Sequence, residues 1–121
     1  MHVLRSRTLN LSVSIPLLLS AAAVSAQSIT ELQKLASAGD PESQFRLGIE
    51  YALGQNVPRD MSEALLWYRK AADQGNAVAE YKIGQLYEHG LGVPPDPAEA
   101  MRWYRKFSDT QYKTTTNPPR R

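Results

Sequence analysis

Between residues 61 and 74 the apolar positions follow the period of an α-helix. Ala64, Leu65, Tyr68, Ala71 and Ala72 fall on one helical face, and its small residues allow another helix to come close. A preceding helix is predicted from residue 40 to about residue 53, because Asp-Pro at 40–41 supplies an N-cap and a first-turn proline. Gly, Asn and Pro within residues 54–59 end that helix and turn the chain. The pattern predicts two antiparallel helices over residues 39–74.

The same pattern occurs twice, because residues 75–110 repeat residues 39–74 with a shift of 36 positions and no gap. A fixed period of this kind is typical of repeat proteins, in which each unit buries its apolar face against the next. Gly48 and Gly84 recur inside the first helices, which predicts close approach of another helix at both places. Gly92 corresponds to Asn56, and both residue types tolerate a positive φ, so we expect the turn geometry to repeat.

The sequence outside the two units completes the predicted fold. Residues 27–38 resemble a further second helix without its partner, and we expect this capping half-repeat to cover the apolar end of the stack. The second helices begin with Asp60-x-x-Glu63 and Asp96-x-x-Glu99, which predict capping boxes with Asp in place of Ser or Thr. Residues 111–121 are rich in Thr and predicted to be a flexible tail. The predicted fold is all-α: an α/α solenoid of two helix-turn-helix repeats, residues 39–74 and 75–110, plus one N-terminal capping helix.

Residues 1–26 have the pattern of a secretory signal peptide. Arg5 and Arg7 precede an apolar run over residues 9–24, and small residues follow, so cleavage is predicted between Ala26 and Gln27. The alternative is an uncleaved membrane anchor, but the run is shorter than the roughly 20 residues that span a bilayer. The segment therefore predicts a periplasmic or secreted protein with no integral membrane span after cleavage.

Charge and cysteine content narrow the function classes. The chain has 14 Lys and Arg and 12 Asp and Glu, and removing Arg5 and Arg7 with the signal leaves 12 of each sign. This balance, without a basic stripe, argues against a nucleic-acid partner. There is no Cys, so disulfides cannot supplement the helix packing. Arrays generally need about three units to close a core, so we expect a weak homodimer or a partner protein to complete the exposed end.

The motif pattern resembles the Sel-one-like repeat (SLR), a relative of the tetratricopeptide repeat. That family pattern has Leu-Gly-x-x-Tyr-x-x-Gly-x-Gly-Val-x-x-Asp, followed by Ala-x-x-Trp-x-x-x-Ala-Ala-x-x-Gly. The resemblance implies a protein-interaction scaffold and carries over no catalytic residue. Departures from the pattern are Asn56, Ile83 and Phe107-Ser108. The matching residues are Leu47, Gly48, Tyr51, Gly54, Val57, Asp60, Ala64, Trp67, Ala71, Ala72 and Gly75, then Gly84, Tyr87, Gly90, Gly92, Val93, Asp96, Ala100 and Trp103.

Positions that differ between the units are candidates for partner recognition. Those on the first helices are spaced i, i+4, i+7, i+8 and i+11, so they form one stripe opposite the shared Gly and Tyr. In related helical solenoids this face lines the concave groove. The alternative is ordinary solvent-facing variation, with Ile49, Leu53 and Leu86 packing on an adjacent helix. The stripe comprises Glu42, Arg46, Ile49, Glu50 and Leu53 in the first unit and Val78, Lys82, Gln85, Leu86 and His89 in the second.

Aromatic and basic residues of the second helices keep an alternative ligand open. Trp67 and Trp103 could be interaction hot spots, although their identical placement favours packing. The basic pairs at 69–70 and 105–106 could recognise an anionic sugar, but a solvated helix face with Asp73 and Asp109 as ion-pair partners is the simpler interpretation. An envelope polysaccharide or peptidoglycan is therefore the alternative ligand.

Catalytic and metal chemistry have little support in the sequence. His89 is the only His after residue 26, whereas zinc needs three or four ligands, and no nucleophile–base pair is available. Glu42 and Glu50 share a face but lie about 12 Å apart, beyond the usual spacing of glycosidase carboxylates. We therefore expect no metal and no cofactor, and a cell-wall or β-lactam hydrolase is the least favoured alternative. The sequence predicts a non-catalytic scaffold or adaptor that modulates or assembles a partner protein.

Overall fold

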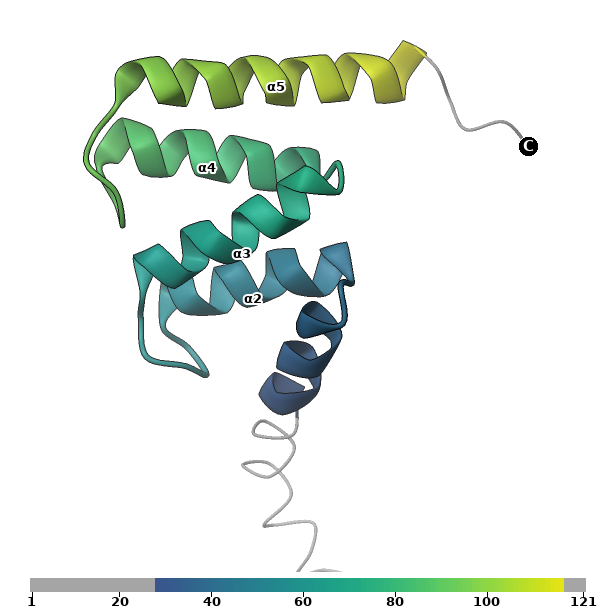
Figure 1. The fold of residues 1–121 in the computed structure, drawn as a ribbon, viewed down its shortest axis with the longest axis vertical. Helices are drawn as coiled ribbons and strands as arrows, with labels where there is room; N and C mark the ends of the chain where they lie inside the picture. The colour runs from purple at the N-terminus through teal and green to yellow at the C-terminus, as the bar shows by residue number, and fades with distance from the viewer. Residues whose placement is uncertain (1–27, 117–121) are drawn as a thin grey trace, which may run out of the picture. The chain divides into compact units, whose positions relative to one another are not determined.

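The computed structural model describes residues 28–116, and the regular structure in this range is entirely helical. A first helix covers residues 28–37 and is followed by α2 (Pro41–Leu53), α3 (Met61–Asp73), α4 (Ala77–His89) and α5 (Pro97–Thr116) (Figure 1). The chain divides into two compact units at residue 31, and α2 to α5 lie in the second unit. The predicted all-α fold with two helix-turn-helix repeats is confirmed.

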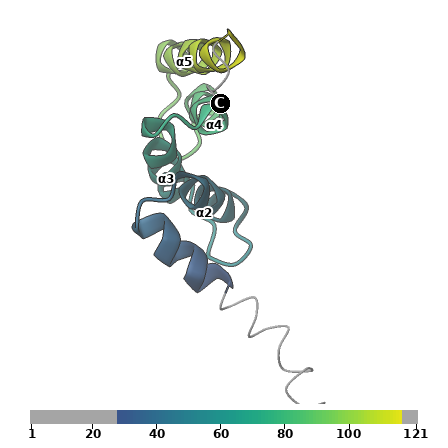
Figure 2. The same ribbon diagram turned by 90° about the vertical axis from the view of Figure 1, so that its right-hand side faces the viewer.

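Consecutive helices of the second unit pack against one another. In both views α3 lies between α2 and α4, and α4 lies between α3 and α5 (Figures 1 and 2). The signal peptide expected over residues 1–26 lies outside the described residues. Within residues 28–116, no helix combines the length and the apolar character needed to cross a membrane.

Short polar side chains begin the helices, and glycines end the first helix of each repeat. The side chains of Asp40, Asp60 and Asn76 accept hydrogen bonds from backbone N–H groups in the first turns of α2, α3 and α4. Gly54 and Gly90 end α2 and α4 in the left-handed conformation, with φ of 68° and 66°. These caps satisfy backbone groups that a helix leaves unpaired at its ends, so the predicted boundaries are confirmed.

The predicted capping boxes lack their reciprocal hydrogen bond. The backbone N–H of Asp60 donates to the carbonyl of Tyr51 at 2.9 Å, and that of Asp96 donates to the carbonyl of Tyr87 at 2.9 Å. Each N–H therefore already donates to a carbonyl and does not donate to the glutamate side chain three residues later. The aspartate side chains do accept hydrogen bonds from the backbone N–H of Glu63 and Glu99, so this half of each predicted box is confirmed. The return hydrogen bond is absent because each connecting turn lies beside the end of the preceding helix, where the last carbonyls have no partner within the helix.

The recurrent glycines mark the closest approach of the two helices within each repeat. A Cβ at Gly48 would lie 2.5 Å from Cδ1 of Tyr68, and a Cβ at Gly84 would lie 2.5 Å from Cε1 of Tyr104. Real side chains do not approach so closely, so glycine is required for the packing of α3 on α2 and of α5 on α4. The prediction of close helix approach is confirmed at both positions.

Matched apolar residues of the repeats fill the core. Leu47 of α2 and its counterpart Ile83 of α4 are 1% and 0% exposed. A continuous cluster of buried residues joins one face of α3 to one face of α4. Its buried members are Ala64, Leu65, Tyr68, Ala71, Ala72, Ala79, Ile83 and Leu86.

Two polar side chains are buried at matched positions of the first helices. Gln44 Nε2 donates to the carbonyl of Ala36 at 3.2 Å, and Gln44 Oε1 accepts from Gln74 Nε2 at 2.8 Å. Glu80, 36 positions later, accepts from Thr110 Oγ1 at 3.1 Å through Oε1. Its other oxygen, Oε2, is buried without a hydrogen-bond partner among the described residues. The second repeat therefore reproduces only half of the polar pattern of the first.

The two turns differ where Asn56 corresponds to Gly92. Gly92 has a φ of 75°, whereas within residues 28–116 no residue other than glycine has a positive φ. A Cβ at Gly92 would lie 2.6 Å from the carbonyl of Met61, so this turn lies directly against the start of α3. Asn56 instead donates from Nδ2 to Glu50 Oε2 at 2.8 Å. The expected repetition of turn geometry is confirmed at Gly54 and Gly90 but is wrong at Asn56 and Gly92, because the second turn meets a neighbouring backbone that requires glycine.

Helix α5 continues past the end of the repeat pattern. The hydroxyls of Thr114, Thr115 and Thr116 donate to the carbonyls four residues earlier at 2.9, 2.8 and 2.7 Å. Each hydroxyl thus finds its acceptor within the helix, the arrangement that Thr commonly adopts inside a helix. The prediction of a flexible tail over residues 111–121 is therefore wrong for residues 111–116, which are helical; residues 117–121 lie outside the described range.

Candidate functional site

A pocket of about 240 Å³ lies beside α4, and we name it the α4 pocket. Lys82, Gln85 and His89 lie on one face of α4 and form its polar rim. The rest of the wall comes from α2, α3 and the turn after α4. The complete lining is Ala52, Met61, Tyr68, Lys82, Gln85, Leu86, His89 and Leu91.

The floor of the α4 pocket is made by the packing of the repeats themselves. Tyr68 and Leu86 are 3% and 5% exposed, and Tyr68 is the residue that contacts Gly48. Burial raises the pKa of Tyr68 to about 12, because the phenolate form is poorly solvated there. The phenol is therefore neutral at physiological pH, and the pocket has an apolar floor beneath a rim that carries Lys82 and His89.

Four of the ten predicted stripe residues line the α4 pocket: Lys82, Gln85, Leu86 and His89. Leu86 belongs to the buried core cluster and forms floor rather than exposed surface. The placement of Leu86 on a freely exposed stripe is therefore corrected, because the apolar face of α4 turns toward α3. The alternative interpretation, in which Leu86 packs on an adjacent helix, describes its position.

The other stripe residues are not gathered into this pocket. Glu42 and Arg46 are exposed on α2, and Ile49 packs against the core cluster. Leu53 and Val78 are 59% and 48% exposed, at the end of α2 and the start of α4. The stripe is therefore not one continuous surface, and only four of its five second-repeat residues line the α4 pocket.

Glu50 has a local structural contact that the sequence pattern did not indicate. Its Oε2 accepts hydrogen bonds from the backbone N of Asn56 at 3.3 Å and from Asn56 Nδ2 at 2.8 Å. The carboxylate thus holds the turn that follows α2. In the second repeat the same helical position is Leu86, so the two repeats use this position for different purposes.

Four lining residues were not among the predicted site residues: Ala52, Met61, Tyr68 and Leu91. Ala52 is the last residue but one of α2, Met61 begins α3, and Leu91 lies in the turn between Gly90 and Gly92. The sequence could have indicated Leu91 as a site residue, because a large apolar residue between two turn glycines has no position in the repeat core. In the structure its side chain is 38% exposed. Nothing in the sequence indicated Ala52 and Met61, since their approach to α4 depends on how the repeats stack.

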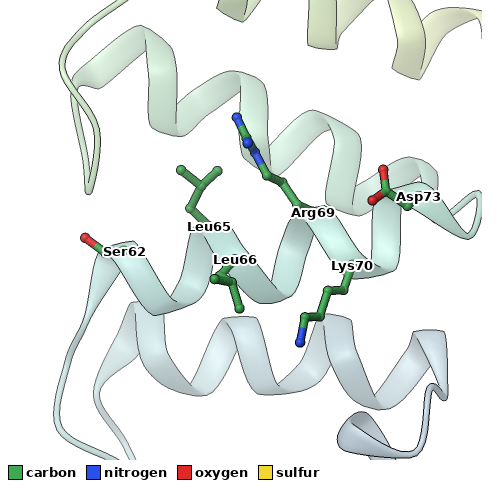
Figure 3. Close-up of a pocket in the computed structure, with 6 residues that line it drawn as sticks. All are labelled: Ser62, Leu65, Leu66, Arg69, Lys70 and Asp73. Atoms are coloured by element: carbon green, nitrogen blue, oxygen red, sulfur yellow. The ribbon is translucent and has the colours of Figure 1, made fainter.

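A second hollow, of about 290 Å³, follows α3, and we name it the α3 hollow (Figure 3). Leu65 and Arg69 point toward α4 in this view, whereas Leu66 and Lys70 point toward α2. Every lining residue belongs to α3, so the hollow is a surface of one helix. The lining residues are Ser62, Leu65, Leu66, Arg69, Lys70 and Asp73.

The basic residues of the second helices are held against aromatic rings. Arg69 donates to the hydroxyl of Tyr87, and its guanidinium carbon lies 5.8 Å from that ring centroid. Lys70 Nζ lies 4.3 Å from the ring centroid of Trp67, and the matched pair of the second repeat is 4.9 Å apart. These cation–π contacts fix the direction of the cations.

The predicted ion pairs of Asp73 and Asp109 with these basic residues are wrong. Within residues 28–116 the ion pairs are Glu88 with His89 at 3.9 Å and the i,i+3 pair in the first turn of α5 at 3.2 Å. An exposed ion pair contributes little, about 0–1 kcal/mol, so a ring contact can replace it.

The carboxylate of Glu88 lies next to His89 of the α4 pocket, but Glu88 is not one of the lining residues. Glu88 Oε2 accepts a hydrogen bond from the hydroxyl of Tyr104 at 2.6 Å and lies 3.9 Å from His89 Nε2. Desolvation, and then this hydrogen bond, raise the pKa of Tyr104 to about 12. The described residues contain no group of three or more His, Cys, Asp or Glu arranged to hold a metal ion.

The two repeats match a family model described as Sel1 repeat, over residues 41–76 and 77–109. Together these matches cover more than half of the chain, and each begins at the first residue of α2 or α4. The chain belongs to the Sel1 repeat family. Sel1 repeats are generally protein–protein interaction scaffolds without catalytic activity. No curated protein matches the chain.

Two crystal structures of Sel1 repeat proteins resemble this chain. A Sel1 repeat protein from Oxalobacter formigenes is 40% identical with a TM-score of 0.62, and the match covers 65% of this chain and 32% of that one. A protective antigen of uropathogenic Escherichia coli with an SLR fold is 33% identical with a TM-score of 0.68, and the match covers 70% of this chain and 18% of the antigen. This chain therefore corresponds to a third or less of either neighbour.

Proposed function

We propose that this chain is a non-catalytic adaptor that acts in the periplasm or outside the cell and modulates or assembles a partner protein. The observation that supports this proposal is the α4 pocket, where residues that differ between the repeats surround an apolar floor. Shared residues such as Gly48 and Tyr68 hold the repeats together. The residues free to specify a partner are therefore those on the rim.

The extracytoplasmic location rests on residues 1–26. Fractionation of cells that produce the chain, followed by N-terminal sequencing, tests this part. We expect a mature form in the periplasm or medium that begins at Gln27. A cytoplasmic chain that keeps Met1 would contradict the proposed location without affecting the binding site.

Crosslinking in intact cells tests the partner. A photoreactive amino acid at Gln85, on the rim of the α4 pocket, should capture a protein of defined size. The matched control carries the same group at Arg102, whose side chain is 75% exposed on α5, away from the pocket lining. Equal capture from both positions, or capture from neither, would contradict binding at the α4 pocket.

Completion of the open end of the array is a second part of the proposal. Met101 on α5 corresponds to Leu65 on α3, yet it is 53% exposed whereas Leu65 is 7% exposed. No following repeat covers Met101 within the described residues, so we propose that a weak homodimer or the partner covers this end. Light scattering over a range of concentrations should show reversible association, and a strictly monomeric chain would exclude the dimer.

An envelope glycan is the second candidate ligand, favoured by the repeated Trp67–Lys70 and Trp103–Lys106 pairs. Sugars stack on an open aromatic face, but each lysine already lies over the ring of its tryptophan. A glycan array compared with a pull-down from envelope extract separates the two candidates. Binding to a defined glycan that is lost in Trp67→Ala would favour the glycan.

A further inference from the structure

We propose that the α4 pocket binds a peptide segment of the partner protein by inserting one apolar side chain, while Lys82 on the rim holds an Asp or Glu next to it. This inference rests on the proposed function and names the chemistry of the partner. It is carried by the size of the pocket, by the charges on its rim and by the difference between the two repeats.

The size of the α4 pocket favours a single side chain over a small-molecule ligand. Its volume is about 240 Å³, whereas sites for drug-sized ligands span roughly 300–1,000 Å³. A cavity of about 150 Å³ lined by apolar residues accommodates benzene. The α4 pocket therefore has room for one Leu, Ile or Phe side chain and part of the backbone that carries it. Met61, Tyr68 and Leu86 offer that side chain an apolar surface.

The rim adds a requirement for negative charge. The eight lining residues include Lys82 and His89 and no Asp or Glu. Lys82 forms no ion pair or hydrogen bond with any residue of the range 28–116, so its ammonium group is available to a partner. Glu88 Oε2 accepts a hydrogen bond from the hydroxyl of Tyr104 and lies 3.9 Å from His89 Nε2, so Lys82 is the rim cation without a carboxylate partner in this range. A carboxylate next to the inserted side chain would complement this rim.

The corresponding position of the first repeat does not provide the same site. Arg46 matches Lys82 in charge and position, but it lies outside the pocket lining. Glu50 stands where the second repeat has Leu86, and it places a carboxylate where the α4 pocket has apolar floor. Arg46 is therefore a matched control for the charge of Lys82.

The test selects peptides from a random 12-residue library displayed on phage, using the purified full chain. The expected result is enrichment of sequences with Leu, Ile or Phe next to Asp or Glu. An enriched peptide should bind about tenfold more weakly to Lys82→Glu than to the unchanged chain, since one attractive charge contact becomes repulsive. Arg46→Glu should change its affinity less than twofold. Affinity should fall as salt rises, because the rim contact is solvent-exposed.

A second variant separates the apolar contact from the charge. Ala52→Leu adds volume at the pocket wall and should weaken the same peptide at least tenfold, and circular dichroism will show whether the variant keeps its helices. Enriched peptides without an acidic residue, equal weakening by Lys82→Glu and Arg46→Glu, or no enrichment would each overturn the proposal. In any of these cases capture of a protein from Gln85 would still support the adaptor function, so the two proposals can fail independently.

Discussion

Replacing Glu80 by Gln should stabilise the chain, although the substitution lies in the core and adds no apolar surface. Glu80 is 1% exposed and leaves Oε2 without a donor among the described residues. Gln44 occupies the same position in the first repeat and donates to the carbonyl of Ala36. The carbonyl that corresponds to Ala36 after a shift of 36 positions is that of Ala72. Both carbonyls already accept a hydrogen bond from the glycine three residues later, at 3.1 and 2.9 Å, so their surroundings match.

The expected magnitude follows from the cost of an unpaired buried group. An unsatisfied buried donor or acceptor costs about 1–3 kcal/mol, and a new hydrogen bond contributes about 1 kcal/mol net. In Glu80→Gln the amide Nε2 replaces the unpaired oxygen and can donate to Ala72, while Oε1 keeps its contact with Thr110. We expect unfolding free energy to rise by about 1–2 kcal/mol, which raises Tm by about 5–12 °C for a domain of this size.

Urea unfolding followed by circular dichroism measures this change. The reverse variant, Gln44→Glu, removes the donor to Ala36 and should lower stability by about 1–3 kcal/mol. Glu42→Gln makes the same chemical change on the exposed face of α2 and should stay within about 0.5 kcal/mol. If Glu80→Gln unfolds at the same or a lower urea concentration with an unchanged m-value, the inference that Oε2 lacks a partner is refuted.

Three further predictions concern the helix contacts and their response to pH. Gly48→Ala gains about 1 kcal/mol of helix propensity, but its Cβ would clash with the buried ring of Tyr68 at a cost of about 1–3 kcal/mol. Thermal unfolding should therefore show a net loss of stability of about 1 kcal/mol. Gly84→Ala should lose less, because its neighbour Tyr104 is only half-buried and can move; an equal loss in both variants would contradict this reasoning. Since burial raises the pKa of Tyr68 from 10.0 to about 12, the folded chain holds that proton more tightly than the unfolded chain, and stability should be full below pH 10 and fall between pH 10 and 12. Tyr68→Phe should reduce that fall in alkaline urea titrations, and an unchanged slope would argue against the assignment. Hydrogen bonds from the side chain and the backbone N–H of Ser43 lower the pKa of Asp40 below 3.8, so its contribution should be present above pH 3.8 and disappear as pH falls further. Asp40→Asn should reduce the loss of unfolding free energy that accompanies a fall in pH below 3.8. An unchanged loss in urea titrations at low pH would show that other carboxylates cause it.

Much of the fold could be predicted from the sequence because residues that the packing requires occur at the same position in both repeats. A glycine inside a helix is unfavourable, so its recurrence at Gly48 and Gly84 indicated a packing reason at both places. Caps such as Asp40 and Gly54 act through hydrogen bonds to residues within one turn, and local chemistry was therefore sufficient to place the helix ends. Helix α5 was the exception, because its continuation to Thr116 lies beyond the repeat and had no second copy to compare.

The candidate site was predicted less completely. The face of α4 was identified from its variable residues, but the same rule also selected Glu50, which holds its own turn, and Leu86, which is buried. Variation between repeats marks every position that packing does not constrain equally in both, so it cannot separate recognition from local hydrogen bonding. Leu91 and Met61 enter the pocket from segments distant in sequence and could not be found from a helical period.

The sequence by itself determined the helices, their order and the pairing of each glycine with a close neighbour, because these depend on period, capping and the size of nearby side chains. Only the tertiary structure decided which side chains surround the α4 pocket and which buried oxygen has no donor. Those properties depend on how one repeat rotates and stacks on the next. That geometry is set by the summed contacts of α2, α3 and α4 rather than by any single residue.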